Sequence, residues 1–242
     1  MEFKFEDIIS VGDLHGHWEV VIEHINRYDI KNTLYLCVGD FGVGTHLTKN
    51  KEFLLKLNDT LKSSNNSFFT IRGNHDDPEW FVSGKHDDFK KQLSNILFIE
   101  DYSILNINDE NYLFIGGAHS VDRVARNGRG LPHWEDEVVR FDYDFCETVS
   151  NIDRMFCHTS PMFCPPIGPH SGFIMDNAES DPSLLQDIYN ERTQMTKIVD
   201  DIMANNKLKT FHYGHFHKPS KITHNGCEFI CLDINEFSMI NY

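Results

Sequence analysis

The chain has 242 residues, of which 40% are hydrophobic and 12% aromatic, a composition ordinary for one large α/β domain with a sizeable core. We therefore expect a single domain over residues 1–242. The formal net charge is −15, so the surface as a whole repels the phosphate backbone of long nucleic acids, and a small substrate is favoured.

Six short runs of apolar, β-branched or aromatic residues each end abruptly in polar residues, which is typical of a buried strand followed by a functional loop. In chain order the runs are IISVGDLH, LYLCVGD, FFTIRGNHD, YLFIGGAHS, MFCHTSP and TFHYGHFH. Ligands of such sheets gather outside the carboxyl ends of the strands. We therefore expect the polar residues that follow these runs to form one site.

Apolar residues at three- and four-residue spacing predict helices between the strands. The predicted helices cover roughly 17–29, 49–63, 134–150 and 183–206. Strands that alternate with helices indicate βαβ units. The segments 121–133 and 162–182 lack this periodicity, and we expect both to be long loops over the strand ends.

Five of the strand ends carry side chains that bind metals. The candidate ligands are Asp13, His15, Asp40, Asn74, His158, His215 and His217. Mixed oxygen and nitrogen ligands suit manganese, iron, zinc, cobalt or nickel, and manganese is our first choice. Two such ions held ~3.5–4 Å apart clamp a phosphoryl group and acidify a bridging water into a nucleophile.

The cysteines and the N-terminus bear on the location of the protein. Six cysteines are too few and too scattered for a disulfide scaffold in a chain of this length, so reduced and mostly buried thiols are expected. The first residues, MEFKFEDIIS, lack the apolar core of a signal peptide, and no run approaches the ~20 apolar residues of a membrane span. We expect a cytoplasmic protein without membrane contact; the sequence leaves its oligomeric state open.

The ordered set GDLHG, GD, GNHD, a lone His and GHFH resembles the calcineurin-like metallophosphoesterase superfamily from Asp13 to His217. The resemblance implies an α/β fold of two mixed β-sheets packed as a sandwich and flanked by helices. It assigns to the first metal Asp13, His15, Asp40 and His217. It assigns to the second metal Asp40, Asn74, His158 and His215.

The same resemblance implies that His75 protonates the leaving group as a general acid rather than binding metal. Val43 stands where the Ser/Thr phosphatases of the superfamily carry the Asp that orients this His, and Gly44 stands where they carry Arg. These two departures count against a protein phosphatase. Asp76 or Asp77 is the candidate to orient His75 in place of the missing Asp.

The run GGAHSVDR is similar to the GGAxSVDR run of a small branch found in bacteria and phages, and GDFG at the second motif fits that branch as well. Within and after this run, Arg123, Arg126 and Arg129 are candidates to bind a substrate phosphate, because guanidinium offers a planar donor fork to oxyanions. The alternative is a solvated basic loop that balances acidic neighbours. His119 is a candidate for substrate contact or for support of the metal ligands.

The expected reaction is metal-dependent hydrolysis of a phosphomonoester or phosphodiester bond in a small phosphorylated molecule, with nucleotides as candidates, through a hydroxide that bridges the two metals. The alternatives are a protein Ser/Thr phosphatase, a nuclease-type phosphodiesterase and a metal-binding scaffold, since retromer contains a subunit with this fold that serves mainly as a binding module. Every ligand position is filled here, which favours an enzyme.

Overall fold

A computed structural model describes residues 2–44, 47–167 and 171–240, and in these ranges the strands form two mixed sheets. The strands are β1 (Glu2–Phe3), β2 (Asp7–Val11), β3 (Thr33–Cys37), β4 (Ser67–Thr70), β5 (Ile96–Phe98), β6 (Ile104–Ile107), β7 (Glu110–Ile115), β8 (Arg154–Cys157), β9 (Thr210–Tyr213), β10 (Ser220–His224), β11 (Cys227–Cys231) and β12 (Phe237–Met239). The seven-stranded sheet has the order β1-β6-β7-β8-β9-β11-β10, and the five-stranded sheet has the order β12-β2-β3-β4-β5.

Parallel pairing dominates the centre of both sheets. In one sheet β2, β3, β4 and β5 are all parallel, and β12 runs antiparallel to β2. In the other sheet β7, β8, β9 and β11 are parallel, β6 pairs antiparallel to β7 and parallel to β1, and β10 pairs antiparallel to β11. The carboxyl ends of parallel neighbours lie at the same edge of a sheet. The loops that follow these strands are therefore brought together.

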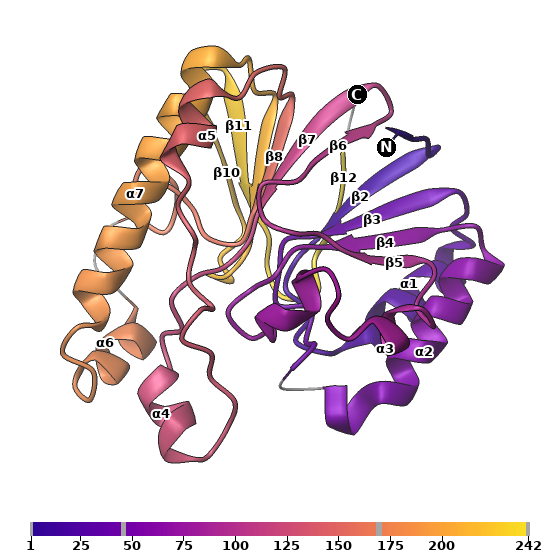
Figure 1. Ribbon diagram of the computed structural model, residues 1–242, viewed down its shortest axis with the longest axis horizontal. Coiled ribbons are helices and arrows are strands. Elements are labelled where there is room, and N and C mark those ends of the chain that lie inside the picture. The colour runs from indigo at the N-terminus through magenta and orange to yellow at the C-terminus, as the bar shows by residue number, and fades with distance from the viewer. Residues whose placement is uncertain (1, 45–46, 168–170, 241–242) are drawn as a thin grey trace.

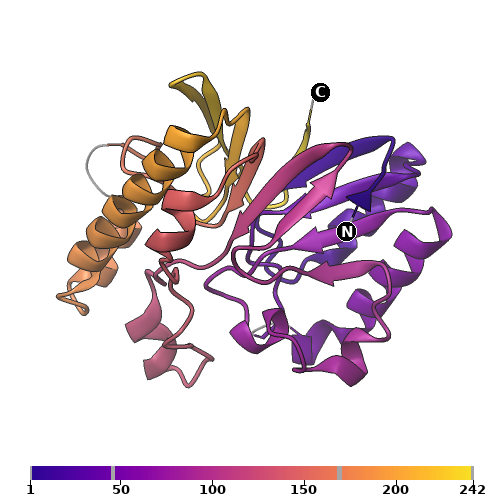
Figure 2. The ribbon, with the colours of Figure 1, turned by 45° about the horizontal axis from the view of Figure 1, so that its top comes forward.

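Helices cover the outer faces of the two sheets, as Figure 1 and Figure 2 show. The helices are α1 (Trp18–Tyr28), α2 (Leu47–Ser63), a 3₁₀ turn at Pro78–Phe81, α3 (Asp87–Lys90), α4 (Arg123–Gly128), α5 (Tyr143–Thr148), α6 (Gly172–Ala178) and α7 (Leu184–Asn205). Helices α1 and α2 lie outside the five-stranded sheet, and α5 and α7 lie outside the seven-stranded sheet. None of these helices is long and apolar enough to cross a membrane.

Strand β3 shows why the sheets lie between two apolar layers. All five of its residues are buried. Because successive side chains of a strand point to opposite faces, Tyr35 and Cys37 join the core under α1 and α2, while Leu34 and Leu36 join the core between the sheets. A continuous apolar run is the pattern of a strand that is covered on both faces. The predicted two-sheet α/β fold is confirmed.

The six predicted strands are confirmed as β2, β3, β4, β7, β8 and β9, and three of the four predicted helices are confirmed as α1, α2 and α7. The prediction of a helix over 134–150 is wrong except for α5. The main-chain carbonyls of Asp136, Glu137 and Val138 accept hydrogen bonds from the Arg72 guanidinium. These tertiary bonds replace the helical ones.

The two predicted loops are also corrected in part. Segment 121–133 contains the short helix α4, and segment 162–182 contains α6, which begins where the Ser171 hydroxyl accepts the N–H of Ile174 at 3.5 Å. Residues 168–170 of the second segment lie outside the described residues. Helices of six or seven residues are too short for an apolar period to reveal them. All six cysteines are buried and unpaired, as expected.

His212 on β9 is a buried imidazole that lies flat on the ring of Phe156, with 4.6 Å between ring centroids. Its two ring nitrogens have no hydrogen-bond partner in the part of the chain that the structure describes. Burial, together with the charge of Arg154, lowers the pKa of His212 to about 3. The folded protein therefore holds this histidine in its neutral form.

This burial predicts a pH-dependent cost. Below the unfolded-state pKa of about 6.5, the unfolded chain takes up a proton at His212 that the folded chain does not, so the free energy of unfolding falls by up to about 1.4 kcal/mol per pH unit. We expect His212→Leu to show a shallower slope than the natural protein in urea unfolding between about pH 5 and 6.5. Equal slopes would contradict the neutral assignment, whatever packing energy the substitution changes.

Candidate metal centre

The predicted metal ligands converge at the junction of the two sheets. Asp13, Asp40 and Asn74 follow β2, β3 and β4 of one sheet, whereas His158 and His215 follow β8 and β9 of the other. Five loops separated by up to two hundred positions in the chain thus meet at one edge. This is the place where open α/β sheets bind ligands.

Two buried carboxylates form the centre of the cluster. The Oδ2 of Asp13 lies 2.9 Å from Nε2 of His217 and accepts the N–H of His215 at 2.9 Å. The Oδ1 of Asp40 accepts the N–H of His75 at 2.8 Å, and Oδ2 of Asp40 lies 3.7 Å from Nε2 of His15. Main-chain donors therefore fix both carboxylates in place.

The amide oxygen of Asn74 faces two imidazoles. It lies 2.9 Å from Nε2 of His158 and 2.9 Å from Nδ1 of His215. The Nδ1 of His158 donates to the carbonyl of Val38 at 2.8 Å, so in the neutral ring Nε2 carries a lone pair. That lone pair points at the oxygen of Asn74 and lies 3.4 Å from Oδ1 of Asp40. Several acceptors thus meet where a positive charge is required.

The pKa values of this cluster also show that positive charge is favoured beside the carboxylates. Burial alone would lower the pKa of His158, but the carboxylates of Asp40 and Asp13 raise it to about 9. Burial opposes ionisation of Asp40, but the imidazoles of His158 and His75 hold the pKa of that carboxyl well below its usual range. The negative charge of the buried carboxylates therefore favours cations beside them.

The donor set fits divalent metals. Three groups of side chains have ligand atoms within 4.8 Å of one another: Asp13 with His15 and His217, His15 with Asp40 and His75, and Asp13 with Asp40 and His158. The buried Oδ1 of Asp13 has no hydrogen-bond partner among the described residues, which leaves it free to bind a cation. Oxygen and imidazole ligands without thiolates suit the transition metals predicted from the sequence.

The backbone of the ligand loops is held in an uncommon conformation. His15, Asp40, His215 and His217 all have positive φ angles, between 47° and 65°. Such a conformation costs about 1–3 kcal/mol for a residue other than glycine, and it is concentrated at functional sites. Four of the seven predicted ligands share it. These backbone conformations therefore lower the stability of the fold, while they direct the four side chains toward the site.

Two glycines allow the loops to approach one another. A Cβ atom on Gly73 would lie 2.1 Å from Oδ1 of Asp40, and a Cβ atom on Gly214 would lie 2.0 Å from Oδ1 of Asp13. Any side chain at either position would displace a carboxylate of the centre. The glycines before Asn74 and His215 are thus required by close packing against the ligands.

Asp76 does not serve as the orienting partner of His75 that we predicted. Its two carboxylate oxygens accept four main-chain N–H groups, from Phe41, Gly42, Val43 and Gly73, at 2.7–3.1 Å. The side chain is fully buried. Asp76 therefore fastens the loop of Asp40 to the loop of Asn74, and its contribution to the site is structural. Asp77, the other candidate, caps the 3₁₀ turn through the N–H of Glu79.

His75 lies at the edge of the cluster. Its ring centroid is 5.0 Å from that of His15, and its imidazole belongs to the same group of neighbouring ligand atoms as His15 and Asp40. Burial lowers the pKa of His75, against the opposing charge of Asp40. The imidazole lines the cavity over the centre, which is where a proton donor to a leaving group must stand.

The side chain of Asn74 is oriented by Ser120, which was not among the predicted site residues, and by Arg126, which was predicted to contact substrate. Its Nδ2 donates to Oγ of Ser120 at 3.0 Å, and Nη1 of Arg126 donates to the same oxygen at 2.8 Å. The Ser120 N–H in turn donates to Glu137 at 2.8 Å. The polar end of the GGAHS run indicated that Ser120 lies near the site. The contact between Ser120 and Asn74 is seen only in the folded structure.

Glu191 is a second such residue. It is buried on α7, and Oε2 accepts the N–H of His119 at 2.8 Å. The sequence signal was a charged residue on the apolar face of the predicted helix, between Ile188 and Met195. Glu191 also lines the cavity over the metal centre.

Three of the four candidates for substrate contact, Arg123, Arg126 and His119, are engaged by the protein itself, and the fourth, Arg129, is exposed. The guanidinium of Arg123 bonds Asp181 at 2.5 Å and Asp187 at 2.6 Å, and lies 3.4 Å from Nδ1 of His119. Arg126 is buried, and its Nε donates to the carbonyl of Pro132 at 2.9 Å. These contacts favour the alternative, in which the arginines balance neighbouring acidic and carbonyl groups, over binding of a substrate phosphate.

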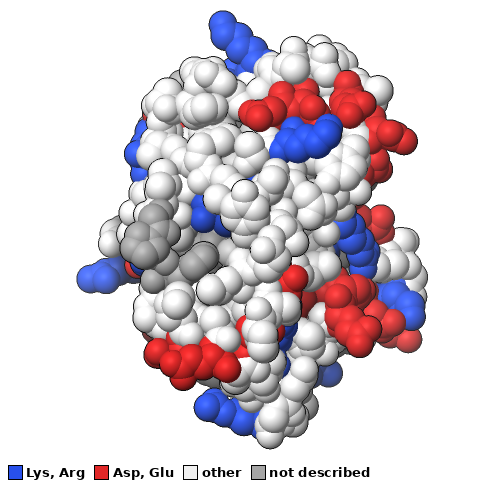
Figure 3. Space-filling view, turned by 90° about the vertical axis from the view of Figure 1, so that its left-hand side faces the viewer, with Lys and Arg blue, Asp and Glu red and all other residues white. Residues whose placement is uncertain are grey.

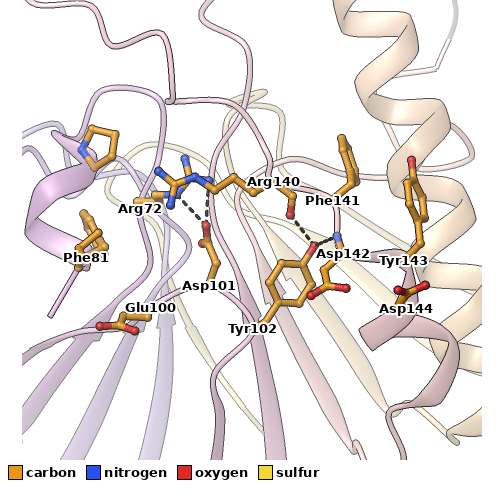
Figure 4. A pocket seen from close by; sticks show the side chains of 12 residues that line it. Arg72, Phe81, Glu100, Asp101, Tyr102, Arg140, Phe141, Asp142, Tyr143 and Asp144 are labelled. Atoms are coloured by element: carbon orange, nitrogen blue, oxygen red, sulfur yellow. Dashed lines mark hydrogen bonds and ion pairs between the residues drawn. The ribbon is translucent and has the colours of Figure 1, made fainter.

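Arg72 supports the loop that follows β4 and carries Asn74. Its guanidinium is almost fully buried, donates twice to Asp101 at 2.9 and 3.0 Å, and donates to the Glu137 carbonyl at 2.7 Å. Figure 4 shows this pair in a separate cavity of about 670 Å³, between Phe81 on one side and Tyr102 and Tyr143 on the other. Four of the predicted metal ligands, Asp40, Asn74, His215 and His217, line the other cavity instead.

The fold and this cluster define a metal-dependent phosphoesterase. The family model of the calcineurin-like phosphoesterases matches residues 7–219, so the chain belongs to that family and the resemblance to the superfamily is confirmed, whereas the branch found in bacteria and phages stays a prediction. No curated protein matches the chain in sequence.

Solved structures with the same fold are distant in sequence. A putative 5′-nucleotidase from Staphylococcus aureus shares 11% identity over 94% of this chain, with a TM-score of 0.50. The match covers 48% of that protein, so the chain spans about half of its length. The protein TT1561 of Thermus thermophilus shares 9% identity over 98% of this chain and 99% of that one, also with a TM-score of 0.50. These likenesses show the fold alone.

The Asp76 contacts predict a large effect on stability. Asp76→Asn turns one acceptor into an amide that faces N–H donors, so we expect the free energy of unfolding to fall by about 3 kcal/mol in urea or thermal unfolding. Asp77→Asn is the matched control, because asparagine caps helical turns as well as aspartate and this site is half-buried. A loss no larger at Asp76 than at Asp77 would contradict the structural role.

Proposed function

We propose that the chain hydrolyses a phosphomonoester or phosphodiester bond of a small molecule at a centre of two divalent metals. The observation that carries the proposal is the convergence of seven side chains with oxygen or nitrogen ligand atoms from both sheets, two of which are the buried carboxylates Asp13 and Asp40. Manganese is the proposed metal, and the buried, unpaired thiols suit a reducing compartment such as the cytoplasm.

Two groups of residues would hold the metals, with Asp40 common to both. The first group is Asp13, His15, Asp40 and His217. The second group is Asp40, Asn74, His158 and His215. When bound, the pair of cations supplies Lewis acidity and lowers the pKa of a water between them.

The remaining chemistry belongs to the chain. His158 is held by the Val38 carbonyl in the tautomer that leaves Nε2 available, and the amide of Asn74 is held by Ser120. His75 would give a proton to the leaving oxygen, because it lines the cavity beside the ligands without being required by either group. Main-chain fixing of Asp13 and Asp40 keeps the site organised before substrate arrives.

Substitution of the shared carboxylate tests the proposed centre. Asp40→Asn removes the charge that both metal groups share, so we expect loss of at least one metal per chain by elemental analysis and loss of turnover of nitrophenyl phosphate esters. Asp109→Asn is the matched control, because its exposed side chain pairs only with Lys4 in the described structure. Full metal content in Asp40→Asn would refute the shared ligand.

Substitution of His75 tests the proposed acid. His75→Ala should keep both metals and slow hydrolysis of an alkyl phosphate by roughly 10²–10⁴, as expected for loss of a general acid. Nitrophenyl phosphate has a better leaving group and needs less proton transfer, so its hydrolysis should be slowed much less by the same substitution. An equal loss on both substrates, or a loss of metal, would show that His75 binds metal or shapes the site instead.

A further inference from the structure

The cavity over the metal centre has two unlike sides. One side is formed by Asp40, Asn74, His75, His215 and His217. The other side is an apolar wall that consists of Met162, Ile167, Phe173, Ile174, Ile188 and Tyr189. The wall comes from the segment after β8 and from helices α6 and α7. The volume is about 400 Å³, which is enough for a small ester but not for a folded polypeptide.

The apolar wall is exposed although it is hydrophobic. The exposed fraction is 70% for Ile167, 62% for Phe173 and 54% for Tyr189. Figure 3 shows that uncharged atoms occupy most of the face that α6 and α7 form, with charged side chains largely toward its edges. A contiguous apolar surface beside polar groups marks a ligand site. Here it is continuous with the catalytic cluster.

The guanidinium groups near the wall are committed to the protein. Arg192 donates to three main-chain carbonyls of the segment 161–166. Arg123 bonds the carboxylates of Asp181 and Asp187. One lysine and two carboxylates also line the cavity, namely Lys218, Asp122 and Glu191. The cavity therefore favours one phosphoryl group, at the metal side, and an uncharged group at the wall.

We propose that the substrate is a phosphoester whose alcohol portion is apolar and bears a ring, and that Phe173 and its neighbours on the wall bind that portion. The inference rests on the proposed phosphoesterase function and specifies its substrate class. The ring packs against side chains of α6 and α7 while the phosphoryl group lies against the metal ligands. Sugar phosphates and polyphosphate chains would leave the wall exposed to water.

Two phosphates with equivalent leaving groups test the proposal on the manganese-loaded protein. Naphthylethyl phosphate and ethyl phosphate both release a primary alcohol, so a difference in kcat/KM reports binding of the ring rather than leaving-group chemistry. We expect naphthylethyl phosphate to be favoured by about tenfold or more, mainly through KM. Phe173→Ala should reduce this selectivity ratio several-fold. Phe53→Ala, which removes an exposed ring from α2, should retain the natural ratio.

The outcomes separate the two proposals. Turnover of both esters with a ratio near one, or a Phe173→Ala ratio equal to that of Phe53→Ala, would overturn the apolar substrate class and leave the phosphoesterase function standing. Failure to hydrolyse either ester or nitrophenyl phosphate would overturn both. Binding of the product naphthylethanol, followed by its own fluorescence, needs no turnover and should weaken in Phe173→Ala but not in Phe53→Ala.

Discussion

Charge balance at the junction of the two sheets is the constraint on which the site depends. Asp13 and Asp40 are buried carboxylates whose neighbours include an amide oxygen and imidazole nitrogens. Burying such groups together is costly unless positive charge compensates them. The raised pKa of His158, to about 9, reflects the same requirement. The proposed pair of divalent cations would satisfy it with the side chains that both sheets supply.

The surrounding structure is arranged to preserve that geometry. Asp76 joins two ligand loops through four main-chain N–H groups, and Gly73 and Gly214 permit contacts that a Cβ atom would prevent. The positive φ angles of four ligands are maintained by these tertiary contacts rather than by local preference. Stability and function are thus in tension here, since four of the predicted ligands themselves have unfavourable backbone conformations.

Much of the fold and site was predictable because each strand end combines an apolar run, which predicts the strand, with polar residues, which predict the site. The apolar run of LYLCV indicates a strand covered on both faces, and the Gly39-Asp40 that follows marks the ligand loop. The role of Asp76 was not predictable, because three of its four partners are main-chain groups more than thirty positions away. The prediction of a helix over 134–150 was wrong for a related reason. The side chain of Arg72, distant in the chain, donates hydrogen bonds to main-chain carbonyls that a helix would use. Local patterns identify elements and ligands, whereas tertiary hydrogen bonds decide which polar residues support them.

The apolar wall on α6 and α7, which we propose as the substrate contact, lies on other elements than the proposed metal ligands at the sheet ends. The central claim, that the ligands hold two cations, is tested most directly by anomalous diffraction from crystals grown with manganese. The account predicts two peaks about 3.5–4 Å apart, with Asp40 between them, Asp13 and His217 at one, and Asn74 and His158 at the other. A single peak, or peaks away from Asp40, would contradict it.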